Sequence, residues 1–249
     1  MNSKNTFLHL LFSLFTCLII CSCATTQDTT KKKTSEELFT EGKNYLDKEK
    51  FEDAKKIFES LTLMESNGDL ADKAQFYLAE SYFLNDEFKL ATFHFNRLRA
   101  LYPQSKYYSY SIFRTGESYE KSAPQYERDQ QTLKYSIDQF KAFVQIFPND
   151  ALADSARKKI VSIRGVLAKK EIGVANHYIK VEEYKSAIIY LDKIIENYSD
   201  TEIYELAIKT KIECLKNLDE IVEAKKIAEK FLSEFPKSKL ASEINSLIK

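Results

Sequence analysis

The sequence predicts an all-α fold built from a stack of helical hairpins. Two observations carry this expectation. The 249 residues are rich in Leu, Ile, Ala, Lys and Glu, which favour helices, and only five Gly and four Pro interrupt them. One spacing of bulky and small residues also recurs five times along the chain, which is typical of repeat proteins.

The recurring unit begins with a bulky residue. A small residue follows nine positions later, and two apolar residues come four and then three positions further on. The third copy has Ser at the small position and carries eight extra residues before it. The copies are Tyr45, Ala54, Phe58, Leu61; Tyr82, Ala91, Phe95, Leu98; Tyr119, Ser136, Phe140, Phe143; Tyr178, Ala187, Leu191, Ile194; and Leu215, Ala224, Ala228, Phe231.

Another small residue precedes the bulky one by three positions in four copies, as Gly42, Ala79, Gly116 and Ala175, whereas the fifth copy has Ile212. Together these features resemble the tetratricopeptide repeat, a helical hairpin of about 34 residues. The resemblance implies a superhelix of five hairpins, in which stacked neighbours bury each other's apolar faces. The tail, residues 237–249, keeps apolar residues at helical spacing and is expected to form a C-terminal cap helix.

The first 22 residues are expected to be a signal peptide. Their apolar run, from Phe7 to Ile20, is shorter than the roughly 20 residues that span a bilayer. The run ends in Ile20-Cys21-Ser22-Cys23, which resembles the bacterial lipobox and implies acylation of Cys23. Acyl chains at Cys23 would hold the protein on a membrane by its N-terminal lipid. An ordinary secretory signal with a coincidental cysteine is the alternative.

Residues 23–34 are rich in Thr and Lys without an apolar period, which predicts a lipidated flexible tether. Once the signal has been removed and Cys23 acylated, Cys214 is the remaining thiol, so no internal disulfide is expected. We expect Cys214 to be a buried, unreactive side chain.

The repeats divide into a front half, residues 35–148 with repeats one to three, and a rear half, residues 149–249 with repeats four and five and the cap. One long helix from Ala151 to Val181 is expected to join them, because this stretch has no Pro and keeps an apolar period. Gly165 and Gly173 within it could permit a bend or mark close packing.

Two segments resemble a narrower family than the repeat itself. The insertion KSAPQYERDQQT contains a Pro followed by Arg128, Asp129 and Gln130, and the segment IRGVLAKKEIGVANHYIKVEEYKSAIIYLDKIIENYSDT covers residues 163–201. With the lipobox and five repeats, they resemble the BamD family of outer-membrane assembly lipoproteins. Two features depart from the family pattern: Ser136 stands where a repeat normally has Ala, and Val181-Glu182 where relatives often have Arg-Gly. The second leaves open whether the rear half contacts its partner in the usual way.

This resemblance implies a protein on the periplasmic face of the outer membrane. It implies that the chain receives unfolded outer-membrane proteins, whose last strand usually ends in an aromatic residue. It also implies docking onto the periplasmic domains of the β-barrel insertase subunit through the rear repeats.

The first helices of stacked hairpins line the concave side, which allows a binding groove to be placed on the sequence. In the front half these positions offer several aromatic, aliphatic and basic side chains, which suit an extended peptide with large apolar side chains and a terminal carboxylate. The alternative is that several of the rings pack against the next repeat. The predicted groove residues are Phe39, Lys43, Leu46, Lys73, Phe76, Phe83, Tyr110 and Phe113.

Composition and motifs argue against other classes of function. The 37 basic residues are balanced by 37 acidic ones, so nucleic-acid binding is not expected. His9, His94 and His177 have no metal-ligand spacing, and no metal or cofactor is expected. The sequence contains no HExxH, GxSxG, Walker loop or paired CxxC motif, so we expect no enzyme activity.

Three hypotheses follow. The first is a non-enzymatic, lipid-anchored scaffold that passes β-barrel precursors to the membrane insertase. The second is a repeat lipoprotein that acts as an adaptor in envelope maintenance or cell division, similar to the repeat proteins of the Tol-Pal system. The third, an enzyme of cell-wall metabolism, has no catalytic constellation to support it.

Overall fold

The computed structural model describes residues 33–65, 67–123 and 130–248. Contacts divide the chain into two units, Met1–Thr34 and Ser35–Lys249. The predicted signal peptide, the acylation of Cys23 and most of the predicted tether lie outside the described residues, as do Arg128 and Asp129 of the insertion.

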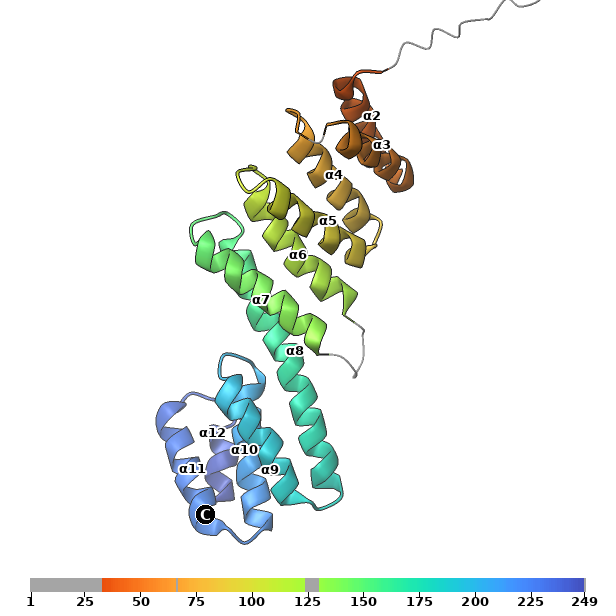
Figure 1. Ribbon diagram of the computed structural model, residues 1–249. Coiled ribbons are helices and arrows are strands. Elements are labelled where there is room, and N and C mark those ends of the chain that lie inside the picture. Colours follow the sequence, from red (N-terminus) through yellow and green to blue (C-terminus); the bar gives the residue numbers. More distant parts are fainter. Residues whose placement is uncertain (1–32, 66, 124–129, 249) are drawn as a thin grey trace, which may run out of the picture. The chain divides into compact units, whose positions relative to one another are not determined.

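Every regular element in the described part of the chain is an α-helix, and each helix packs antiparallel to the next in sequence (Figure 1). This confirms the predicted all-α tetratricopeptide-repeat superhelix. Five hairpins, α2/α3, α4/α5, α6/α7, α8/α9 and α10/α11, are followed by α12. The bounds are α2 Ser35–Asp47, α3 Phe51–Met64, α4 Ala71–Leu84, α5 Phe88–Leu101, α6 Tyr108–Ser122, α7 Gln131–Ile146, α8 Ala153–Lys180, α9 Tyr184–Asn197, α10 Ile203–Asn217, α11 Ile221–Glu234 and α12 Ala241–Leu247.

The small residues of the first helices bring the paired helices into close contact. A methyl group built on Gly116 would lie 2.9 Å from the ring of Phe140, and one on Gly42 would lie 2.8 Å from the ring of Phe58. Both rings are fully buried. Glycine at these two positions therefore leaves the space that the ring of the second helix fills.

Ser136, which replaces the usual Ala of the repeat, has a structural reason. Its side chain is fully buried, and its hydroxyl donates a hydrogen bond of 2.8 Å to the backbone carbonyl of Gly116 on the paired helix. A buried hydroxyl needs such a partner, and here the partner lies on the neighbouring helix of the same hairpin. The substitution thus ties α6 to α7.

Four of the hairpin turns share one backbone conformation. The middle residue of each turn has a positive φ, between 57° and 63°, although none is glycine; these residues are Glu49, Asp86, Glu182 and Asp219. The following backbone N–H donates to a carbonyl in the last turn of the first helix, as from Glu183 to Tyr178 at 3.0 Å. Glu182 therefore adopts the left-handed conformation that glycine accommodates with less strain.

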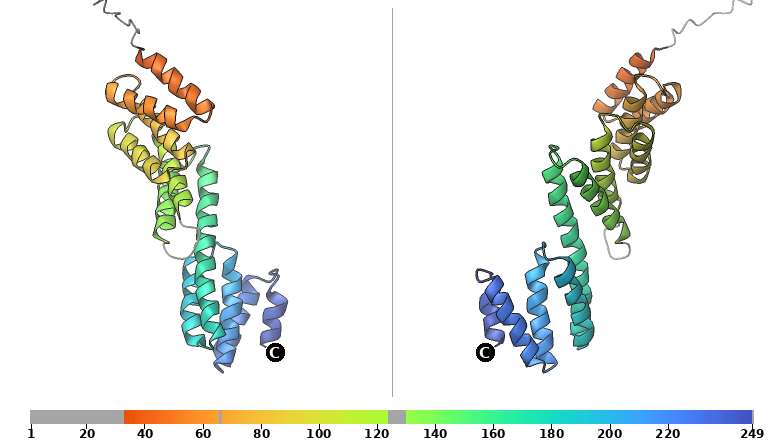
Figure 2. Two further views of the ribbon diagram at one scale, coloured as in Figure 1. Left: turned by 90° about the vertical axis from the view of Figure 1, so that its right-hand side faces the viewer. Right: turned by 60° about the vertical axis from the view of Figure 1, so that its left-hand side comes forward.

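The long helix was predicted nearly to the residue, since α8 runs from Ala153 to Lys180 (Figure 2). It packs against α7 on one side and α9 on the other, and one core cluster runs from Ile112 in α6 to Cys214 in α10. Nothing lies within 4 Å of a methyl group built on Gly165 or Gly173, so neither glycine is a close-packing site.

Ion pairs also connect α8 to the repeats before and after it. In its first half, Lys159 Nζ lies 2.7 Å from a carboxylate oxygen of Glu120 on α6. Further along the helix, the guanidinium of Arg164 donates two hydrogen bonds to Asp200 beyond α9. One helix therefore closes repeat three and opens repeat four.

The cap helix covers the apolar end of the stack. Ile244 of α12 is fully buried in a cluster with Ile208, Ile212 and Phe231 of the fifth repeat. Lys209 Nζ also lies 2.6 Å from Glu243. In the described residues no helix is both long and apolar enough to cross a membrane.

We expect Gly116→Ala and Gly173→Ala to change stability in opposite directions. Alanine favours both helices by up to about 1 kcal/mol, but at residue 116 it must displace a fully buried ring, which typically costs about 1–3 kcal/mol. Denaturant unfolding of the full chain should show a loss for Gly116→Ala and a gain of roughly 0.5–1 kcal/mol for Gly173→Ala. Equal gains in both variants would show that the close contact at Gly116 does not constrain the hairpin.

Candidate functional site

The front half presents aromatic side chains on the exposed side of its first helices. Phe39 of α2 packs edge-on against Tyr77 of α4, with ring centroids 5.4 Å apart. Tyr107, just before α6, stacks on Phe76 at 4.1 Å, and Tyr110 lies 5.7 Å from the same ring. Except for Phe76, these rings are half-buried, so each leaves an edge or face open to a ligand.

Cationic side chains lie over these rings. The ammonium of Lys43 is 4.3 Å from the ring centroid of Tyr77, and that of Lys106 is 5.1 Å from Tyr107. The guanidinium of Arg114 lies 5.1 Å from Tyr110. The quadrupole of each ring attracts the cation above it, which holds positive charge on an otherwise apolar surface. We call this surface, formed by Phe39, Lys43, Tyr77, Lys106, Tyr107 and Tyr110, the first-helix face.

A chain of ion pairs adjoins the first-helix face at Tyr110 and links three repeats. Arg114 of α6 binds both carboxylate oxygens of Glu80 on α4, at 2.9 and 3.1 Å, and Glu117 on its own helix at 2.9 Å. Lys159 of α8 continues the chain, 3.4 Å from Glu117. Because each carboxylate has a cationic partner, the network holds the first helices in register without leaving negative charge unbalanced.

Burial shifts the pKa values of Glu80 in this network and of Tyr110 beside it. It raises the pKa of the Glu80 carboxyl, and the charge of Arg114 opposes that rise. Burial also raises the pKa of the neighbouring Tyr110 hydroxyl, and the charge of Glu80 adds to the rise. Tyr110 therefore stays protonated and can donate a hydrogen bond at neutral pH.

The structure contradicts the prediction for four of the eight groove residues. Leu46, Phe76, Phe83 and Phe113 are buried, with 5–8% of their surface exposed, so the prediction that they line an open groove is wrong. Phe113 packs against the rings of Phe140 and Phe143 in its own hairpin, and Phe83 packs against Phe88 and the guanidinium of Arg114. These side chains hold the repeats together instead.

The other predicted groove residues stay partly accessible. Phe39, Lys43, Lys73 and Tyr110 are half-buried. Gln130 of the insertion is half-buried and directly precedes α7. The structure thus brings Phe39, Lys43 and Tyr110 together on the first-helix face.

Sequence reasoning missed Tyr77, Tyr107 and the network of Glu80, Arg114 and Glu117. A signal was present, because the residue after the small one of the first helix is charged in all three front repeats, as Lys43, Glu80 and Glu117. The predicted groove took Lys43 from this position but left out the equivalent Glu80 and Glu117. Tyr107 lies in the loop before α6, where a count of helical positions does not reach.

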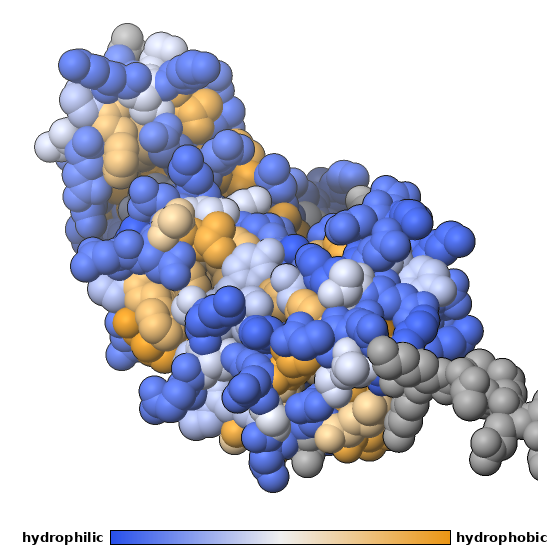
Figure 3. Space-filling model, turned by 90° about the horizontal axis from the view of Figure 1, so that it is seen from above, coloured by the Kyte–Doolittle hydropathy of each residue, from blue (hydrophilic) through white to orange (hydrophobic). Residues whose placement is uncertain are grey.

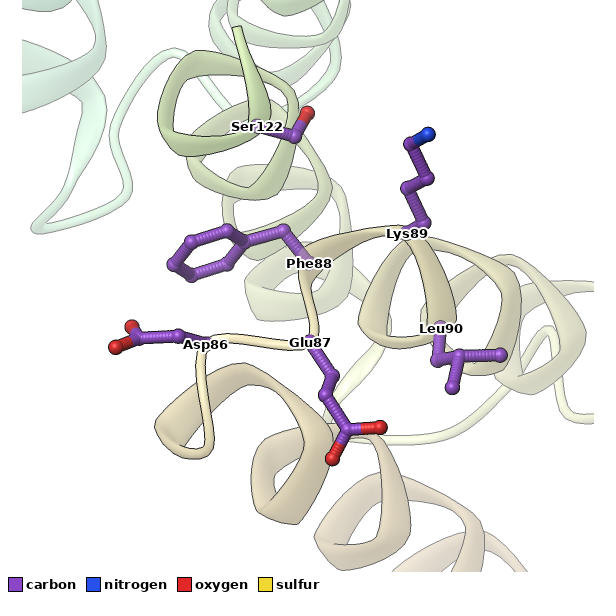
Figure 4. A pocket seen from close by; sticks show the side chains of 6 residues that line it. All are labelled: Asp86, Glu87, Phe88, Lys89, Leu90 and Ser122. Atoms are coloured by element: carbon purple, nitrogen blue, oxygen red, sulfur yellow. The ribbon is translucent and has the colours of Figure 1, made fainter. Parts of the chain in front are cut away.

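A pocket lies elsewhere, between the turn that joins α4 to α5 and the end of α6 (Figure 4). It is lined by Phe88 and Leu90 together with Asp86, Glu87, Lys89 and Ser122. None of these was predicted as a site residue, and the pocket contains no residue of the first-helix face.

Reactive groups of the described residues are either buried or dispersed. Among those residues, no group of His, Cys, Asp and Glu side chains could hold a metal ion. Cys214 is buried, as predicted, and burial raises the pKa of its thiol to about 11. Burial likewise lowers the pKa of His94 to about 4, so this imidazole is neutral at pH 7.

The family model for the outer membrane lipoprotein family YfiO matches residues 31–228. The chain belongs to this family. The match covers all five hairpins up to the middle of α11, including the first-helix face. Membership in the YfiO family makes this an outer-membrane-associated protein.

Curated relatives agree with the YfiO match. The chain is 27% identical over 212 residues to the outer membrane protein assembly factor BamD of Rickettsia prowazekii, covering 85% of this chain and 84% of that protein. It is 28% identical over 238 residues to BamD of Neisseria meningitidis serogroup B, with 89% of each chain covered. Among solved structures, the complex of the TPR2AB domain of yeast Sti1 with pHSP90 is 13% identical with a TM-score of 0.46, over 86% of this chain and 96% of that one.

We expect the bidentate pair of Arg114 and Glu80 to be essential to stability in a way that exposed pairs are not. Arg114→Ala leaves a buried carboxylate without its partner and should lower the free energy of unfolding by about 2–4 kcal/mol. Arg157→Ala, which removes an exposed pair with Asp154, should change it by less than about 0.5 kcal/mol.

The double variant Glu80→Leu/Arg114→Met separates the pair from the individual side chains. Because it removes both charges together, it should regain most of the stability that Arg114→Ala loses. Chemical denaturation of the four proteins provides the measurement. If Arg114→Ala matches Arg157→Ala, the network is not what holds α4 and α6 in register.

Proposed function

We propose that the protein is a non-enzymatic, lipid-anchored scaffold on the periplasmic face of the outer membrane. Its first-helix face receives unfolded precursors of outer-membrane β-barrel proteins, and its rear repeats bind the periplasmic domains of the barrel insertase subunit. Family membership and the assembly-factor relatives support the location at the outer membrane and the role in assembly. The first-helix face is the observation that carries the binding role.

The chemistry of the first-helix face suits an extended chain that ends in an aromatic residue and a carboxylate. Half-exposed rings on α2, α4 and the start of α6 supply contact area at low cost in side-chain entropy. Lys43 and Lys106, held over two of those rings, supply the complement for a terminal carboxylate. The ion-pair network below keeps this surface in a fixed arrangement before a ligand arrives.

The rear repeats offer a different surface for a folded partner. They expose Val181, Ile189 and Val222 to the extent of 55%, 68% and 85%. Val181 belongs to the turn where relatives often have Arg-Gly, so contact with the insertase subunit would use an apolar side chain here in place of a basic one. A scaffold of this kind needs neither cofactor nor metal.

Lys43→Gln should weaken binding of a precursor peptide with a free C-terminal carboxylate about five- to tenfold, corresponding to roughly 1 kcal/mol for a charge-assisted contact. The same peptide with an amidated C-terminus should bind wild type and variant alike. Lys56→Gln, which removes an exposed lysine on the second helix of the same repeat, serves as the matched control. Fluorescence titration gives the affinities, and equal binding of both peptides to the wild type would place the carboxylate elsewhere.

A pull-down from detergent-solubilised membranes distinguishes the proposed scaffold from the adaptor hypothesis. We expect the full chain to recover a large β-barrel protein, and Lys43→Gln to recover it equally because the insertase binds the rear repeats. Recovery of peptidoglycan or Tol-Pal components without a barrel protein would favour the role in envelope maintenance or cell division.

A further inference from the structure

The second helices of the front half end in exposed apolar residues. The last residues of α3, α5 and α7 are Met64, Leu101 and Ile146, with 44%, 53% and 55% of their surface exposed. At the corresponding position α9 ends in Asn197 and α11 in Glu234. The apolar row is therefore a property of the three front repeats.

These residues lie on one side of the stack. Each follows a buried residue of the repeat, Leu61, Leu98 or Phe143, by three positions, so the repeats present them in equivalent places. Leu63, next to Met64, is exposed to 80% and extends the row. We call Leu63, Met64, Leu101 and Ile146 the apolar edge.

The described chain enters the stack at the apolar edge. Ser35, the first residue of α2, donates a hydrogen bond of 2.5 Å from its hydroxyl to Glu65, the residue after Met64. One repeat later, Ser105, in the loop after Leu101, donates a hydrogen bond of 2.7 Å to Asp72 at the start of α4. The first helices thus begin where the second helices end, as the succession of loops shows (Figure 1).

Little chain separates this entry point from the predicted acylation site. Twelve peptide units join Cys23 to Ser35. At no more than about 3.5 Å per residue they reach at most about 40 Å, so acylation of Cys23 would hold the entry point near the lipid surface. The apolar edge lies at that entry point, whereas the hairpin turns lie at the opposite ends of the helices.

We propose that the apolar edge rests on the phospholipid bilayer surface, so that the front repeats stand with their inter-repeat loops at the membrane. This rests on the lipid anchor of the proposed function. The anchor acts as one attachment and the edge as a second, which fixes the orientation that a tether alone would leave free. The first-helix face is then held at a set angle to the membrane.

Neighbouring residues suit an interfacial position. Tyr102 and Lys106 lie in the loop that follows Leu101, and side chains of this kind place an apolar body in the interface and a polar tip in water. Seen from above, the molecule shows several hydrophobic patches separated by hydrophilic side chains (Figure 3). A short row of exposed apolar side chains suits shallow contact with the bilayer interface.

Tryptophan fluorescence tests this directly, because the chain contains no Trp. Leu101→Trp and Ile146→Trp place the probe on the apolar edge. Ile189→Trp, at an exposed apolar position in the middle of α9, is the matched control. Each acylated full-length variant is reconstituted on phosphatidylethanolamine–phosphatidylglycerol vesicles with and without brominated acyl chains, and circular dichroism and flotation of the vesicles accompany each measurement.

On vesicles, the two edge probes should shift their emission to the blue and lose intensity to brominated lipid, and the probe at residue 189 should do neither. Protein that floats with the vesicles but shows unquenched edge probes would overturn the edge contact and leave the anchor intact. Equal quenching of all three probes would also overturn it. Protein that does not float would overturn the anchor and the edge contact together.

Discussion

The hairpins of repeats one and three each depend on one close approach between their two helices. In repeats one and three a glycine of the first helix faces a fully buried phenylalanine of the second, with no room for a methyl group between them. That approach sets the distance between paired helices, and the stacking of hairpins follows from it. The surfaces along the stack therefore inherit their spacing from contacts deep in the core.

The first-helix face shows how a binding surface is built on such a core. Buried rings such as Phe76 hold the half-exposed rings in place, and the ion pairs of Glu80, Arg114, Glu117 and Lys159 fasten three repeats to one another. Most of the aromatic content expected to touch a ligand serves the scaffold. Fewer aromatic side chains than predicted are open to a ligand, but their contacts with buried rings hold them in place.

Much of the fold could be predicted because its signals are local and repeated. Spacing of small and bulky residues located every hairpin, and the absence of Pro located α8 to within two residues at its start. The degree of burial could not be predicted, since it depends on how neighbouring repeats are rotated against each other. Phe76 and Tyr77 are adjacent in sequence, yet the first is covered by Tyr107 from the next repeat and the second stays half-open.

The sharing of α8 between two repeats limits how the protein can be divided. Its first half completes the core around Ile137, Phe140 and Phe143, and its second half pairs with α9. A fragment cut at residue 148 would lose the cover of its last hairpin and leave those side chains in water. A fragment that contains the front repeats should therefore keep all 28 residues of α8. The fragment that contains the rear repeats then lacks the first helix of repeat four.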